Sequence, residues 1–107
     1  MAQKIRKHWP LFQCLLGAET STHARAFIRA TSLNQMTTLI EIIKNVLYGV
    51  IPITEVYKKK LKKHKRIIQH LADTKRITSE TRRVLIRHIG VVLLILQSVK
   101  GVIQSTL

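Results

Sequence analysis

The chain has 107 residues, with 19 Lys and Arg against 5 Asp and Glu, which gives a formal net charge of +14 at pH 7. Apolar residues make up 46% of it, too many for a disordered basic tail, and the single Cys14 excludes an internal disulfide framework. Four Gly and two Pro among many Leu, Ile, Lys and Arg predict an all-α fold, a small bundle of four to five helices with helix pairs joined by short turns.

The first third of the chain predicts two short helices. Trp9 and Pro10 mark the entry to the first, with Pro10 in its first turn, and Gly17 ends it. Cys14 lies in the apolar stretch between Pro10 and Gly17, so we expect a buried thiol. A cap within Thr20-Ser21-Thr22 begins a second helix that runs through Ala30.

The third predicted helix has the clearest amphipathic pattern. Ser32 caps it, Gly49 ends it, and Pro52 prevents its continuation. Its apolar positions follow one helical stripe: Met36, Leu39, Ile40, Ile43, Val46 and Leu47.

A fourth helix is predicted from its cap at Thr54 to the polar turn at 73–76. Its apolar seam has spacings of 4, 3, 4 and 3 and consists of Tyr57, Leu61, His64, Ile68 and Leu71. The other positions are mostly Lys, and like charges at i and i+4, such as Lys58 and Lys62, oppose helix formation. Packing of the seam or a bound polyanion must offset this repulsion.

The fifth predicted helix begins at a cap on Thr78 or Ser79 and includes the apolar run 91–96. A membrane-spanning helix needs about 20 apolar residues, so the run does not predict a transmembrane segment. Three alternatives remain for 89–107: the core-facing end of the helix, a surface for homo-oligomers or another partner, or an interfacial membrane contact. The chain thus divides into short helices over 1–32, a basic helical core over 33–88 and an apolar helix end over 89–107, within one domain.

Positive charge is concentrated in residues 54–88, which hold twelve basic groups and three acids. This pattern predicts polyanion binding by Lys58, Lys59, Lys60, Lys62, Lys63, Lys65, Arg66, Lys75, Arg76, Arg82, Arg83 and Arg87. Lysine suits phosphate contact without base reading, and the five Phe, Trp and Tyr residues are too few for a stacking platform. We therefore expect binding to duplex DNA without sequence preference; a helix-turn-helix regulator is the weaker interpretation.

The sequence predicts neither an enzyme nor a metal or cofactor site. The five His residues form no H-x-x-x-H pair, and no Gly-rich phosphate loop occurs. Five acids in the chain leave little for metal-dependent phosphoryl chemistry.

Residues 33–90 resemble the small basic protein of Polinton (Maverick) elements and adintoviruses, which has been likened to adenovirus core protein X. The resemblance rests on the order of several pieces: Asn45-Val46-Leu47-Tyr48-Gly49, the link Val50-Ile51-Pro52-Ile53-Thr54, the run Tyr57-Lys58-Lys59-Lys60-Leu61-Lys62-Lys63-His64-Lys65, Leu71-Ala72-Asp73 and Arg82-Arg83-Val84-Leu85. Family members often carry Gly-Gly after the second basic helix, where this chain has Ile89-Gly90-Val91.

The resemblance implies a DNA-binding core protein of a virus or virus-like transposon, which neutralises phosphates of the packaged genome in the virion and is found in the host nucleus. It adds a capsid protein as an expected partner. The alternative is a structural or membrane-active virion component whose basic face meets the capsid or anionic lipid.

Overall fold

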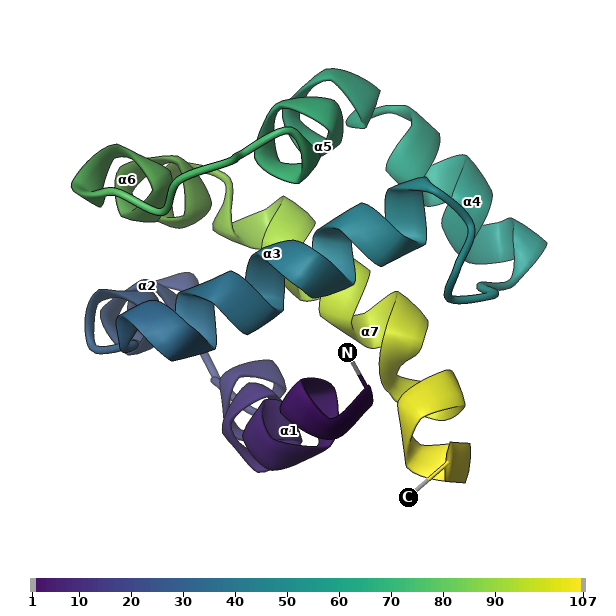
Figure 1. Cartoon of the computed structure of the whole chain (residues 1–107), viewed down its shortest axis with the longest axis horizontal. Coiled ribbons are helices and arrows are strands. Elements are labelled where there is room, and N and C mark those ends of the chain that lie inside the picture. The colour runs from purple at the N-terminus through teal and green to yellow at the C-terminus, as the bar shows by residue number, and fades with distance from the viewer. Residues whose placement is uncertain (1, 107) are drawn as a thin grey trace.

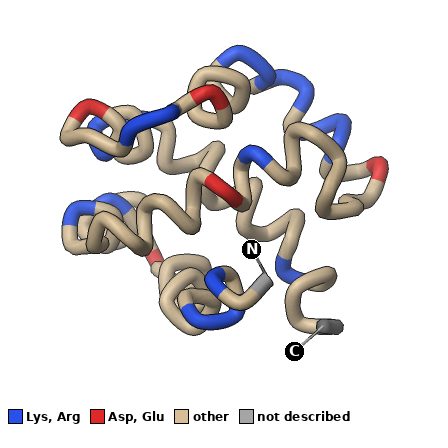
Figure 2. The backbone as a smooth tube through the Cα atoms, viewed as in Figure 1, with Lys and Arg blue, Asp and Glu red and all other residues tan. Residues whose placement is uncertain are grey.

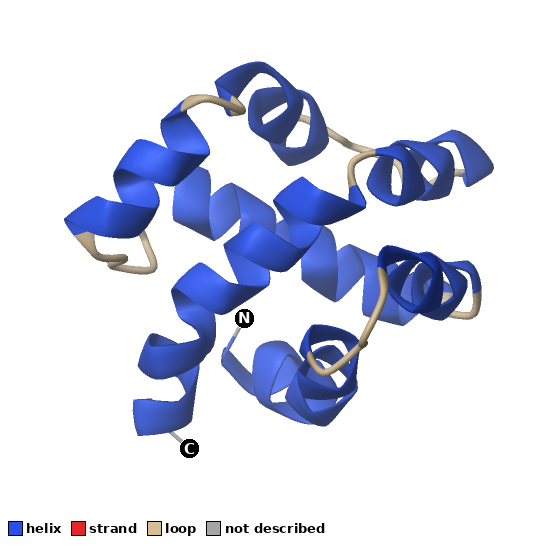
Figure 3. Ribbon diagram, turned by 180° about the vertical axis from the view of Figure 1, so that it is seen from behind, coloured by secondary structure: helices blue, strands red, loops and turns tan. Residues whose placement is uncertain are grey.

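The computed structural model describes residues 2–106 and shows seven helices and no strand within that range. They are α1 (Ala2–Leu16), α2 (Ser21–Arg29), α3 (Leu33–Leu47), α4 (Glu55–Lys62), α5 (Lys65–Ala72), α6 (Ser79–Arg87) and α7 (Ile89–Thr106). α3 and α7 cross at the centre, and the other five helices surround them (Figures 1 and 3). The all-α prediction is confirmed. The predicted count of four to five is too low, because two of the expected helices are each divided in two.

The ends of α3 follow from local sequence as predicted. The Ser32 side chain accepts from the Gln35 N–H, and the Gln35 side chain accepts from the Ser32 N–H. At the other end Gly49 has φ +73°, the left-handed conformation that favours glycine. The N–H groups of Gly49 and Val50 then donate to the carbonyls of Val46 and Asn45, at 3.3 and 2.9 Å. Both ends of this central helix are therefore closed by hydrogen bonds.

The apolar run of α7 forms part of the core. Val92, Ile95, Leu96 and Val99 are fully buried, and α7 packs against α1, α2, α3, α4 and α6. Burial in the core, the first of the three alternatives for residues 89–107, thus accounts for most of this run. No single helix among the described residues is long and apolar enough to cross a membrane; α6 and Ile89–Gln104 meet the length and composition together, across an 83° bend.

The first helix was predicted to start too late. α1 begins at Ala2, which places Pro10 in its interior rather than in its first turn. Burial of Ile5 and Trp9 against the core supports the extra turns, although Pro10 has no N–H to donate to the preceding turn. Ile5, Trp9, Phe12 and Leu15 then share the buried face, and Cys14 lies away from it. The prediction of a buried thiol is therefore wrong, because Cys14 is exposed.

The lysine-rich helix predicted from Thr54 is broken at Lys63 and His64. Its two halves pack on different partners, α4 on α7 and α5 on α3. His64 has φ −113° and ψ 20°, and its side chain is exposed rather than on a packed seam. Repulsion between neighbouring lysines weakens a continuous helix here, and the bend lets Leu61 and Ile68 both reach the core. Thr54 precedes α4 but makes no capping hydrogen bond through its side chain.

The fifth predicted helix is also divided, at His88. Thr78 caps α6 as expected, with Thr81 returning the hydrogen bond. His88 has φ −109° and ψ 39°, its N–H donates to Val84, and its carbonyl accepts from Val91 and Val92. It therefore ends α6 and starts α7 without an intervening glycine or proline. The bend lets α6 pack on α2 while α7 enters the centre.

Candidate nucleic-acid interface

α4, α5 and α6 follow one another around the upper rim of the molecule in Figure 1, and exposed cations occur along all three helices and their connections. We call this set the basic arc; it consists of Lys58, Lys59, Lys60, Lys62, Lys63, Lys65, Arg66, Lys75, Arg76, Arg83 and Arg87, all exposed. Figure 2 shows that every helix carries basic residues, and that they are densest over α4, the α4–α5 break and the start of α5. Eleven of the twelve predicted binding residues are thus exposed, on the helices and connections of this rim.

Few of the arc's charges are neutralised by the protein itself. Within the described residues, the arc has two ion pairs: Lys58 with Glu55 at 3.2 Å and Arg83 with Glu80 at 3.3 Å. Both pairs are exposed and lie within one helix, so each is worth about 0–1 kcal/mol and can be exchanged for a phosphate contact. The Lys60 ammonium lies 5.4 Å from the Tyr57 ring centroid, a weak cation–π contact. Most of the arc's charge therefore faces solvent.

Arg82, the twelfth predicted residue, points into the molecule instead. Its Nη1 donates to the carbonyls of Ile28, Arg29 and Thr31 at 2.8, 3.0 and 2.9 Å, and lies 3.2 Å from the Thr31 hydroxyl. These acceptors lie at the C-terminal end of α2, where a cation also interacts favourably with the helix dipole. The side chain is half-buried. We therefore assign Arg82 to the fold and not to the interface.

The structure reveals a reciprocal contact from Arg25 that sequence reasoning missed. Arg25 Nε donates to the carbonyl of Ile86 at 3.2 Å, near the end of α6. In a continuous helix the Ile86 carbonyl would accept from the N–H of Gly90. The bend at His88 breaks this pattern, and the carbonyl accepts from Arg25 instead. Arg25 of α2 thus donates to a carbonyl near the end of α6, and Arg82 of α6 donates to carbonyls at the end of α2. The two residues are 57 positions apart, and no local pattern in the sequence links them.

A groove of about 500 Å³ extends the basic surface onto α3. Lys44 of α3 lines it together with Lys75 and Arg76 of the α5–α6 connection, and one acid, Glu41, also lines it. The threonine hydroxyls in the lining already donate to backbone carbonyls, so the three cations are the groups available to a phosphate. The sequence did not point to Lys44, because it lies 31 residues from Lys75 and is the only basic residue of α3.

The one amide side chain in residues 54–88, that of Gln69, is not free to read a base. The Gln69 amide donates to both carboxylate oxygens of Asp73, at 3.0 and 3.1 Å, so it is already engaged. The helices on either side of the 73–78 connection pack mainly elsewhere, α5 on α3 and α6 on α2 and α7. A helix-turn-helix reader needs two such helices packed as one unit. The arrangement favours contact with phosphates over recognition of sequence.

No group of three or more His, Cys, Asp or Glu side chains that could hold a metal ion occurs among the residues the structure describes. Comparisons with protein families, with curated proteins and with solved structures find no match to this chain.

Proposed function

We propose that the protein is a non-enzymatic DNA-binding protein that neutralises phosphates of duplex DNA without reading its sequence. One observation carries the proposal. The nine residues from Lys58 to Arg66 contain seven cations and no acid, and all seven cations are exposed. Repulsion between so many neighbouring cations destabilises the isolated protein, and a bound polyanion relieves it.

The dimensions of the molecule suit this role. The protein measures 31 × 29 × 29 Å, and duplex DNA carries about one charge per 1.7 Å of its axis. A duplex segment of this length carries about 17 phosphate charges, and roughly half of them lie on the side that faces the protein. A straight duplex therefore offers phosphates for about eight of the eleven cations of the basic arc.

The resemblance of residues 33–90 to the small basic proteins of Polintons and adintoviruses suggests the setting. In that setting the protein accompanies a packaged genome in a virion and meets the inner face of a capsid protein. The alternative is a structural or membrane-active virion component. It receives less support from the structure, because the buried side chains of α7 would have to leave the core to enter a bilayer.

Binding to three partners, measured side by side, tests the proposal. The full chain is titrated against random-sequence duplex DNA, single-stranded DNA of the same length and vesicles containing anionic lipid. We expect tight binding to duplex with at most threefold differences between sequences, and weaker binding to the single strand. Tighter binding to vesicles with leakage of their contents, or a reproducible preferred DNA sequence, would contradict it.

A further inference from the structure

A pocket lies in the corner that the α4–α5 break forms over the end of α3. Its volume is about 170 Å³, and Val46, Leu47, Ile53, Lys58, Leu61, Lys62, Lys65 and Ile68 line it. Four segments contribute: α3, the 48–54 connection, α4 and α5. A continuous helix through Lys63 and His64 would lack this corner, so the pocket depends on the break.

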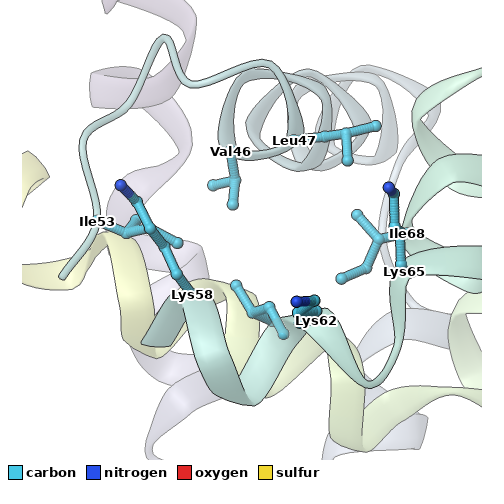
Figure 4. A pocket seen from close by; sticks show the side chains of 8 residues that line it. Val46, Leu47, Ile53, Lys58, Lys62, Lys65 and Ile68 are labelled. Atoms are coloured by element: carbon cyan, nitrogen blue, oxygen red, sulfur yellow. The ribbon is translucent and has the colours of Figure 1, made fainter. Parts of the chain in front are cut away.

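The floor and the rim of this pocket differ in chemistry. Five aliphatic side chains form its apolar lining, and three lysines are the remaining residues around it. Figure 4 shows Lys58 and Lys65 on opposite sides, with Lys62 between them. The lining contains no acid, and Glu55 pairs with one of the three lysines. The pocket therefore matches a ligand with one apolar group and several negative charges around it.

DNA does not meet this description well. Its phosphodiester backbone has no apolar group to bury, and its bases bind to proteins by stacking on aromatic rings, which the lining lacks. A closed cavity of about 150 Å³ lined by Leu, Ile and Phe side chains holds one benzene molecule. The space of about 170 Å³, which is open on one side, is thus of the size of one Leu or Phe side chain.

We propose that this pocket docks an acidic segment of a partner protein, which inserts one Leu or Phe side chain between Lys58, Lys62 and Lys65. Neighbouring carboxylates on the segment pair with the three ammonium groups. Because all three lysines also belong to the basic arc, the segment and DNA exclude each other. The site does not depend on the DNA-binding proposal, since its apolar floor has no part in phosphate contact.

Two labelled peptides test the proposal by fluorescence anisotropy with the full chain. One has a central Leu flanked on both sides by Glu and Asp, and the other has Ser in place of that Leu. We expect the Leu peptide to bind at least tenfold more tightly, because only it fills the pocket. Equal affinities would overturn the proposal, since attraction between charges alone would then explain binding. Dodecanoate that binds to the pocket when neither peptide does would also overturn it.

Two lysines of α4 provide a matched pair of variants. Lys62→Gln changes the rim, whereas Lys59→Gln removes the same charge from an exposed position of α4 that does not line the pocket. We expect Lys62→Gln to weaken the Leu peptide at least threefold more than Lys59→Gln, and both to weaken DNA equally. Equal effects on the Leu peptide would overturn the site.

A floor variant gives a second, independent readout. Leu47 is half-buried, and Leu47→Phe places additional volume in the pocket. We expect the tenfold preference for the Leu peptide to disappear while DNA affinity stays unchanged, with thermal unfolding as the check on folding. If this variant does not fold, the pair Lys62→Gln and Lys59→Gln decides. A chain that binds the Leu peptide but not DNA would refute the proposed function and leave this site standing.

Discussion

The α4–α5 segment and the α2–α6 pair are both basic, yet they use their charges in opposite ways. In the α2–α6 pair, Arg25 and Arg82 donate to backbone carbonyls at the end of the opposite helix. In the α4–α5 segment the lysines project into solvent, and Lys58 alone has a carboxylate partner among the described residues. The difference lies in what each cation can reach. A bent helix end with open carbonyls accepts an arginine, whereas a run without acids leaves its lysines for another molecule.

Basic residues that are neighbours in sequence therefore need not belong to the same interface. Arg82 and Arg83 are neighbours in α6, but the first is half-buried against α2 and the second is exposed. Variants at these positions separate a role in the fold from a role in binding.

The largest effect is expected from charge reversal in the α4–α5 segment. Lys59→Glu, Lys62→Glu and Arg66→Glu together remove three phosphate contacts of about 1 kcal/mol each, so duplex affinity should fall by at least about 150-fold. Stability in urea should not fall, because the change relieves repulsion between lysines. The control, Lys7→Glu, Arg29→Glu and Lys100→Glu, gives the same net charge on α1, α2 and α7. A similar loss in the control would show that net charge, not the arc, determines binding.

A smaller effect is expected from the two neighbouring arginines, and it separates stability from binding. Arg82→Met removes charge-assisted hydrogen bonds to the end of α2 and should lower the free energy of unfolding by about 2 kcal/mol. Arg83→Met should change it by less than about 0.5 kcal/mol, since Arg83 has only an exposed ion pair. Urea unfolding and DNA titration of both variants provide the measurement.

The affinities of these two variants should show the reverse order. Arg83→Met should lower duplex affinity about fivefold by removing one phosphate contact, with Arg82→Met unchanged while folded. If Arg82→Met weakened DNA binding more than Arg83→Met in the folded protein, our assignment of Arg82 to the fold would be wrong.

The smallest effect is expected from the two acids that pair with cations of the basic arc. Glu55→Gln and Glu80→Gln each remove an exposed ion pair, so unfolding should change by less than about 0.5 kcal/mol. Each should raise duplex affinity by up to about fivefold, because a repelling carboxylate is lost and a cation is released. Glu19→Gln makes the same change of charge in the connection between α1 and α2 and should have no effect beyond twofold. An equal gain in Glu19→Gln would argue against a localised interface.

Local patterns in the sequence predicted much of the fold. The caps at Ser32 and Thr78 and the left-handed Gly49 depend on a few adjacent residues, and all three are as expected. The breaks at His64 and His88 were not predicted, because neither position has a Gly or Pro. They arise from long-range packing: α5 lies on α3, and α7 enters the centre between helices that are distant in sequence.

The candidate site likewise has features that follow from local sequence and features that depend on long-range packing. Exposure of the lysine run follows from its composition, and the structure places these residues at the surface. The inward turn of Arg82, the contribution of Lys44 and the pocket between α3, α4 and α5 depend on which helices meet. The periodicity of one segment does not tell which other helices it packs against.

The dependence of DNA affinity on salt tests the central claim most directly. If about eight cations of the basic arc contact phosphates, the logarithm of the binding constant should fall against the logarithm of salt concentration with a slope of about −7. The measurement uses the full chain and a random-sequence duplex across 50–200 mM salt. A slope shallower than about −3 would contradict the account, because the arc would then meet too few phosphates to be the interface.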